Sequence, residues 1–131
     1  AQGPFAKKIE FSEGDMFLVA QNQEEIKKYR TIIFKSVLHD WPIHRVDELL
    51  GHLLSSLSGG SRLIIFERCA FLHRNLRPSS FQDVSNLVFS PFYREPHIYV
   101  DIIKNRFQDF CVEVKYTWID MKWFMLSVER R

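Results

Sequence analysis

Apolar residues recur every three or four positions between residues 46 and 57, the period of one face of an α-helix. The pattern predicts an amphipathic helix, and Pro42 suits its first turn. Gly59 and Gly60 are expected to end it, because glycine adopts the left-handed backbone without penalty. The apolar face that should pack on a core consists of Val46, Leu49, Leu50, Leu53, Leu54 and Leu57.

Continuous apolar runs stand on both sides of this helix, at 31–38 (TIIFKSVL) and 62–69 (RLIIFERC). A continuous run is typical of a strand that is buried on both faces. A strand, a helix and a second strand with short connections form a βαβ unit. The two strands should therefore be parallel, with a right-handed crossover.

Four other segments give weaker patterns. Residues 7–11 (KKIEF) indicate a short strand. The polar stretch 22–30 indicates a helix or a surface connection. Residues 78–89 and 96–107 are predicted helices around the loop SPFYRE. Because the chain has no repeat or linker, residues 1–131 are expected to form a single domain.

Near the C-terminus, apolar and polar residues alternate along 111–118 (CVEVKYTW), as in a strand with one buried face. A second run, 121–130 (MKWFMLSVER), follows after a tight link at residues 119–120. We expect the two runs to form an antiparallel hairpin-like pair. The residues expected to point inward on the first strand are Val112, Val114 and Tyr116.

With 46% hydrophobic and 26% charged residues, the 131-residue chain has the composition of a folded protein. The net charge is only +2, and no apolar stretch is long enough to span a bilayer, so neither a nucleic acid nor a membrane is an expected partner. The two cysteines are too few for a disulfide framework and lack metal-site spacing. We expect a cytoplasmic protein with reduced thiols and no metal.

Three polar segments are expected to meet beyond the carboxyl ends of the strands, where open α/β sheets bind ligands. Asp15 could accept hydrogen bonds from a ligand amine or hydroxyl, while Met16 and Phe17 could flank a flat ring. The alternative is a Gly-Asp turn beside a core methionine and phenylalanine. The three segments are 14–17 (GDMF), 35–41 (KSVLHDW) and 67–69 (ERC).

Two histidines, His39 and His44, are candidates for a general base, because an imidazole titrates near neutral pH. The favoured interpretation of His39 is that it forms, with Asp40, a polar cap on the following helix. His44 is therefore the better candidate base. The sequence contains no G-x-S-x-G motif, no P-loop and no dinucleotide fingerprint, which argues against the chemistries of those motifs.

In their order and spacing, GDMF (14–17), FKSVLHDWP (34–42) and LLSSLSGGSRLIIFER (53–68) resemble the small-molecule O-methyltransferases that use S-adenosylmethionine. That family includes plant caffeate-type and acetylserotonin-type enzymes and bacterial natural-product enzymes. A weaker likeness continues through 93–114. The resemblance implies an α/β, partial Rossmann-like class I methyltransferase fold with a mostly parallel sheet and an antiparallel C-terminal strand. It also implies S-adenosylmethionine as the cofactor.

The resemblance further implies direct methyl transfer to a hydroxyl group of a small molecule, with the protein orienting the reactants. His39 to Trp41 (HDW) would form the floor near the methyl group. The loop with Phe89, Phe92 and Tyr93 would help to line the acceptor site; the alternative is that these aromatics pack two helices together. The residues implied at the cofactor are Asp15, Met16, Phe17, Lys35 and Trp41.

Three features depart from the family pattern. The catalytic histidine of the plant enzymes corresponds to Arg45, with His44 one residue earlier, so methyl transfer by proximity alone stays open. The family's late GF appears as Arg106–Phe107. The family's first strands, its glycine-rich loop and the acidic residue that holds the ribose have no counterpart in the sequence.

The family's sheet order, 3-2-1-4-5-7-6, predicts an open edge in this chain. Segments 7–11 and 31–38 correspond to the third and fourth strands, and the strands that should lie between them are missing. An open edge invites association. We expect the missing N-terminal part of the same protein, or a second copy in a homodimer, to cover it. The alternative function is that of a non-catalytic, truncated methyltransferase-like interaction module.

Overall fold

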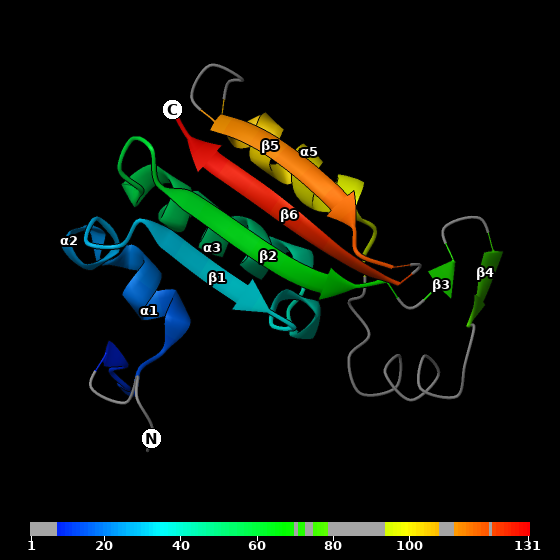
Figure 1. Cartoon of the computed structure of the whole chain (residues 1–131), viewed down its shortest axis with the longest axis horizontal. Helices are drawn as coiled ribbons and strands as arrows, with labels where there is room; N and C mark the ends of the chain where they lie inside the picture. The colour runs from blue at the N-terminus through cyan, green and yellow to red at the C-terminus, as the bar shows by residue number, and fades with distance from the viewer. Residues whose placement is uncertain (1–7, 70, 73–74, 79–93, 108–111, 121) are drawn as a thin grey trace.

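A four-stranded mixed sheet with the order β1-β2-β6-β5 forms the centre of the computed structural model (Figure 1). The structure describes residues 8–69, 71–72, 75–78, 94–107, 112–120 and 122–131. β1 pairs with β2 in parallel, and β6 runs antiparallel to β2 and β5. This order corresponds to the 4-5-7-6 part of the predicted sheet and confirms the α/β, partial methyltransferase fold. The strands are β1 (Thr31–Lys35), β2 (Arg62–Arg68), β5 (Val112–Trp118) and β6 (Trp123–Arg130).

The predicted amphipathic helix is α3 (Ile43–Ser56), which connects the parallel strands β1 and β2. All six residues of its predicted apolar face are buried. The helix ends earlier than expected. Its C-cap is Leu57, and not one of the two glycines. Gly60 has a φ of 82° and serves the turn that leads into β2.

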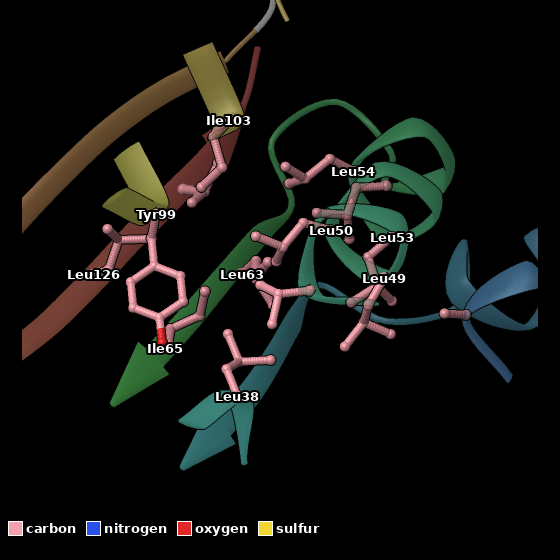
Figure 2. Close-up of a cluster of buried hydrophobic side chains, with 14 of the residues drawn as sticks. Leu38, Leu49, Leu50, Leu53, Leu54, Leu63, Ile65, Tyr99, Ile103 and Leu126 are labelled. Carbon is pink, nitrogen blue, oxygen red and sulfur yellow. The ribbon is translucent and has the colours of Figure 1, made fainter. Parts of the chain in front are cut away.

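The hydrophobic core lies between one face of the sheet and the helices α3 and α5 (Pro96–Arg106) (Figure 1). Figure 2 shows the side chains of the two helices converging on those of β2 and β6, with the Tyr99 ring among them. Outside the core, Arg106 of α5 reaches across Gly51 of α3 and donates two hydrogen bonds to Asp47, at 2.6 and 2.7 Å. The two helices are therefore joined by packing inside and by an ion pair outside.

The prediction that 31–38 is a strand buried on both faces is wrong. β1 covers only Thr31–Lys35, and its side chains alternate between exposed and half-buried, with Ile33 59% exposed. The reason is that β1 is an edge strand and that α3 and α5 cover only one face of the sheet. The exposed residues of β1, which include Ile33, lie on the opposite face. In β2, too, only alternate residues are buried.

The N-terminal region contains two short helices, α1 (Met16–Gln21) and α2 (Gln23–Ile26), of which only the second was anticipated. The predicted strand at 7–11 is wrong for its described residues, 8–11, which form none. A strand needs a hydrogen-bonded neighbour, and the described part of the chain pairs β1 with β2 alone.

The C-terminal hairpin confirms the predicted antiparallel pair. Its connection spans residues 119–122 and is longer than the expected two-residue link. Val112 and Val114 face the core as predicted, whereas Tyr116 is 48% exposed because β5 is the outer strand of the sheet.

Residues 71–78 include a separate two-stranded ribbon, β3 (Phe71–Leu72) and β4 (Asn75–Pro78), that the sequence pattern did not suggest. The predicted helix at 78–89 lies outside the described residues except for Pro78, the last residue of β4. No helix in the part of the chain that the structure describes is long and apolar enough to cross a bilayer.

Candidate functional site

A hollow of about 800 Å³ opens where the start of α1, the segment after β1 and the first turn of α3 meet. Its wall combines apolar and aromatic side chains with two carboxylates and one guanidinium group. Such a mixture is typical of small-molecule sites, which commonly measure about 300–1,000 Å³. The lining residues are Glu13, Gly14, Asp15, Met16, Phe17, Val37, Trp41 and Arg45.

Asp15 is exposed at the rim of this hollow and caps α1, since its Oδ1 accepts a hydrogen bond from the Phe17 backbone N–H at 2.8 Å. Capping fixes the direction of the chain at this point. As a result Phe17 is buried and Met16 partly buried, and both contribute to the lining. The Gly-Asp turn with a buried phenylalanine, one of the two alternatives posed from the sequence, is thus present, and the same segment also lines the hollow.

Two further side chains pack on Phe17. The ring of Trp41 meets it edge to face, with centroids 4.7 Å apart and planes at 81°. The Arg45 guanidinium lies 3.8 Å from the centroid of the same ring, in cation–π geometry. Arg45 also pairs with Glu48 at 3.0 Å. Contacts among these side chains therefore fix one wall of the hollow.

Lys35 lies apart from this group. It lines a second hollow, of about 380 Å³, on the open side of the sheet with Phe66, Ile119, Asp120 and Trp123. The structure thus brings together four of the five residues predicted at the cofactor, namely Asp15, Met16, Phe17 and Trp41, and leaves Lys35 in a neighbouring hollow.

His39 is buried against Glu67, with its Nδ1 2.7 Å from the Glu67 carboxylate. The favoured interpretation of His39 and Asp40 as a cap on α3 is wrong. Pro42 is the N-cap of that helix, and no side chain caps it. The reason is that residues 38–40 form a short helix of their own, η2 (Leu38–Asp40), which turns His39 toward the end of β2.

His44 is exposed in the first turn of α3 and is not among the residues that line the hollow, whereas Arg45 beside it is. The position at which the resemblance implies a catalytic histidine is therefore occupied by Arg45. The predicted acceptor residues Phe89, Phe92 and Tyr93 lie outside the described residues.

The sequence placed Glu67 in the segment 67–69 at the ligand edge of the sheet and Arg94 on the predicted acceptor loop, but it did not predict that both contact the segment at 38–41. The sequence did contain one indication for Glu67, because it is a charged residue directly after the apolar run of β2. Leu38 and Trp41 lie more than fifty positions before Arg94 in the chain, so these two contacts could not be predicted from the local pattern. The described residues contain no group of histidines, cysteines and carboxylates that could hold a metal ion.

The sequence matches the family model of the O-methyltransferase domain over residues 2–94, which is more than half of the chain. The chain belongs to this family. The resemblance seen in the sequence motifs is thereby confirmed, and with it S-adenosylmethionine as the cofactor of the family. A search of curated proteins found no match.

Solved structures share the fold. Human N-acetylserotonin methyltransferase in complex with SAM has a TM-score of 0.70 at 20% identity, covering 96% of this chain and 35% of that one. PigF with SAH has a TM-score of 0.70 at 16% identity, with 98% and 41% covered. An O-methyltransferase family protein from Burkholderia thailandensis has a TM-score of 0.67 at 15% identity, with 95% and 36% covered. The chain thus spans between about 35% and 41% of the length of these relatives.

Proposed function

We propose that the chain is part of an enzyme that transfers a methyl group from S-adenosylmethionine to a hydroxyl group of a small molecule. The observation that carries the proposal is the hollow beyond the end of β1, which is lined by GDMF (14–17) and by Trp41 of HDW, all within residues 2–94 that the family model matches. In open α/β sheets this edge is where ligands bind.

The lining of the hollow fits the adenosine part of the cofactor. Met16 and Phe17 offer an apolar wall for a flat ring, and Trp41 extends it. The Asp15 carboxylate has two oxygens and can accept a hydrogen bond from an exocyclic amine besides the one it accepts from the Phe17 N–H. Lys35, in the neighbouring hollow, would reach the cofactor from the other side of β1.

When bound, S-adenosylmethionine supplies an electrophilic methyl group, and the chain's task is to orient it. The described residues around the hollow favour catalysis by positioning. The guanidinium of Arg45 has hydrogen-bond donors but no acceptor, and the Nδ1 of His39 is engaged by Glu67. In this proposal Phe89, Phe92 and Tyr93 contribute to the acceptor site.

We further propose that the outer edge of β1 is covered in the intact protein, either by an N-terminal part of the same polypeptide or by a second copy in a homodimer. The support is that β1 has a strand neighbour on only one side within the described residues. Ile33 on this strand is an exposed apolar residue, and open edges of this kind associate readily.

A transfer assay tests the function. The full-length gene product is incubated with S-adenosylmethionine labelled in its methyl group and with a panel of small phenols and alcohols. We expect labelled methyl ethers with at least one acceptor. Binding of the cofactor without transfer to any hydroxyl would contradict the proposed reaction, and absence of cofactor binding would favour the interaction module instead.

A further inference from the structure

We propose that Glu67 and Arg94 are positioning residues that hold the segment 38–41 from two sides and thereby place Trp41 in the wall of the hollow. Neither residue lines the hollow. Their role in methyl transfer rests on the function proposed above, whereas their hold on the segment does not.

Glu67 holds the start of the segment. Its side chain, 1% exposed, projects from β2 into the core. One carboxylate oxygen accepts hydrogen bonds from the backbone N–H groups of Leu38, at 2.8 Å, and His39, at 3.4 Å. The other oxygen lies 2.7 Å from His39 Nδ1. A buried carboxylate that is bound by several donors fixes those donors firmly, because leaving it unpaired in the core is costly.

Arg94 holds the end of the segment. It immediately precedes the N-cap of α5 and donates to the carbonyl oxygens of Leu38, at 3.2 Å, and Trp41. The same guanidinium donates to the hydroxyl of Tyr99 at 3.4 Å. Tyr99 is fully buried, and its burial raises the pKa of the hydroxyl, which therefore stays neutral. The arginine is thus bound to α5 through Tyr99 and, at the same time, to the segment 38–41 through two carbonyl groups.

The two residues are complementary in polarity. A short helix leaves N–H groups unsatisfied at its start and carbonyl groups unsatisfied at its end. In η2 the Glu67 carboxylate accepts from N–H groups at its start. Arg94 donates to the carbonyl of Leu38, which also accepts from the Trp41 N–H, and to the carbonyl of Trp41, the residue that follows η2. Trp41 follows η2 directly and packs on Phe17. Movement of the segment would therefore change the wall of the hollow at its aromatic centre.

The test uses the full-length protein labelled with 5-fluorotryptophan, in which the ¹⁹F signal of Trp41 is assigned from its loss in Trp41→Phe. We expect Arg94→Gln and Glu67→Gln to shift or broaden the Trp41 signal and to weaken S-adenosylmethionine binding about tenfold or more. The matched control is Arg106→Gln, which removes an arginine that donates two hydrogen bonds to Asp47 on α3 and does not contact the segment. The control should leave the Trp41 signal unchanged.

Circular dichroism reports whether each variant is folded. If Arg94→Gln does not fold, Arg94→Lys replaces it, since lysine keeps the charge but loses the fork that reaches two carbonyl groups. A Trp41 signal that is unchanged in folded variants of both residues would overturn the proposal. A Trp41 signal that changes in a protein whose wild type binds no S-adenosylmethionine would uphold the hold on the segment and refute the proposed function.

Discussion

Arg45 shows at the scale of a single residue how this chain differs from the plant enzymes that it resembles. The guanidinium packs over Phe17 at the position that the resemblance assigns to a catalytic histidine. An arginine cannot accept a proton at neutral pH. The adjacent His44 points to another part of the surface, because successive residues of a helix are turned by about 100°.

We therefore expect His44→Ala to lower the methyl-transfer rate of the full-length enzyme less than about tenfold, whereas a general base contributes typically 10²–10⁴-fold. The measurement is kcat with a working acceptor, with His52→Ala, another exposed histidine of α3, as the control. A loss of a hundredfold or more in His44→Ala alone would identify His44 as a base despite its place outside the hollow.

At the scale of elements, α3 is held by its apolar face. Leu50 is fully buried between the helix and the sheet (Figure 2). His52, two positions later, is exposed. We expect Leu50→Ala to lower the free energy of unfolding by about 2–5 kcal/mol, because it removes apolar contacts and leaves a cavity. His52→Ala should change it by less than about 0.5 kcal/mol. Urea denaturation measures both, and equal effects would contradict the assignment of the buried face.

The ion pair between α3 and α5 should make their packing depend on pH. Hydrogen bonds from Arg106 lower the pKa of Asp47 below its usual value of 3.8. A carboxyl whose pKa is lower in the folded state stabilises the fold above the unfolded pKa and loses that effect as pH falls through the folded one. Asp47→Asn should cost less than about 1 kcal/mol at pH 7, since the pair is part-exposed.

The cost of Asp47→Asn should shrink below pH 3.8. Urea denaturation of the wild type and the variant at pH 7 and at a pH below 3.8 compares their free energies of unfolding. A difference between the two proteins that stays the same at low pH would exclude this ion pair as its cause.

Elements with a strong periodic pattern could be predicted from the sequence, and those that depend on distant partners could not. The α3 stripe and the C-terminal hairpin followed from local alternation of apolar and polar residues. The exposure of β1 depends on what covers its outer face, and the turn of η2 depends on Glu67, which is 28 positions from His39. In the same way, the motifs indicated Asp15 and Trp41 at the site, but the two residues that hold Trp41 in place emerged only from the structure.

At the scale of the whole molecule, the outer edge of β1 is a surface that can pair with another strand. Arg30 O accepts from Arg62 N, and Ser36 N donates to Phe66 O, so even-numbered residues turn their backbone groups toward β2. Because these groups alternate along a strand, the odd-numbered ones point outward. The outward residues of β1 are Thr31, Ile33 and Lys35.

The 131-residue chain by itself should therefore associate through this edge. We expect its mass, measured by light scattering after size exclusion, to rise with concentration, and Ile33→Lys to shift it toward the monomer. Ile43→Lys, which changes an isoleucine of similar exposure on α3, is the control. A monomeric wild type, or equal effects of the two variants, would contradict association through the β1 edge.

The proposed function requires that the hollow beyond the end of β1 binds the adenosine part of S-adenosylmethionine. Calorimetric titration of S-adenosylmethionine into the full-length protein and its Asp15→Asn variant tests this most directly, because asparagine keeps the cap on α1 and removes the charge. Loss of a charge-assisted hydrogen bond, worth about 1.5–3 kcal/mol, predicts an affinity at least about tenfold weaker. Asp101→Asn, an exposed aspartate of α5, should bind like the wild type. Equal affinity in wild type and Asp15→Asn would contradict the account.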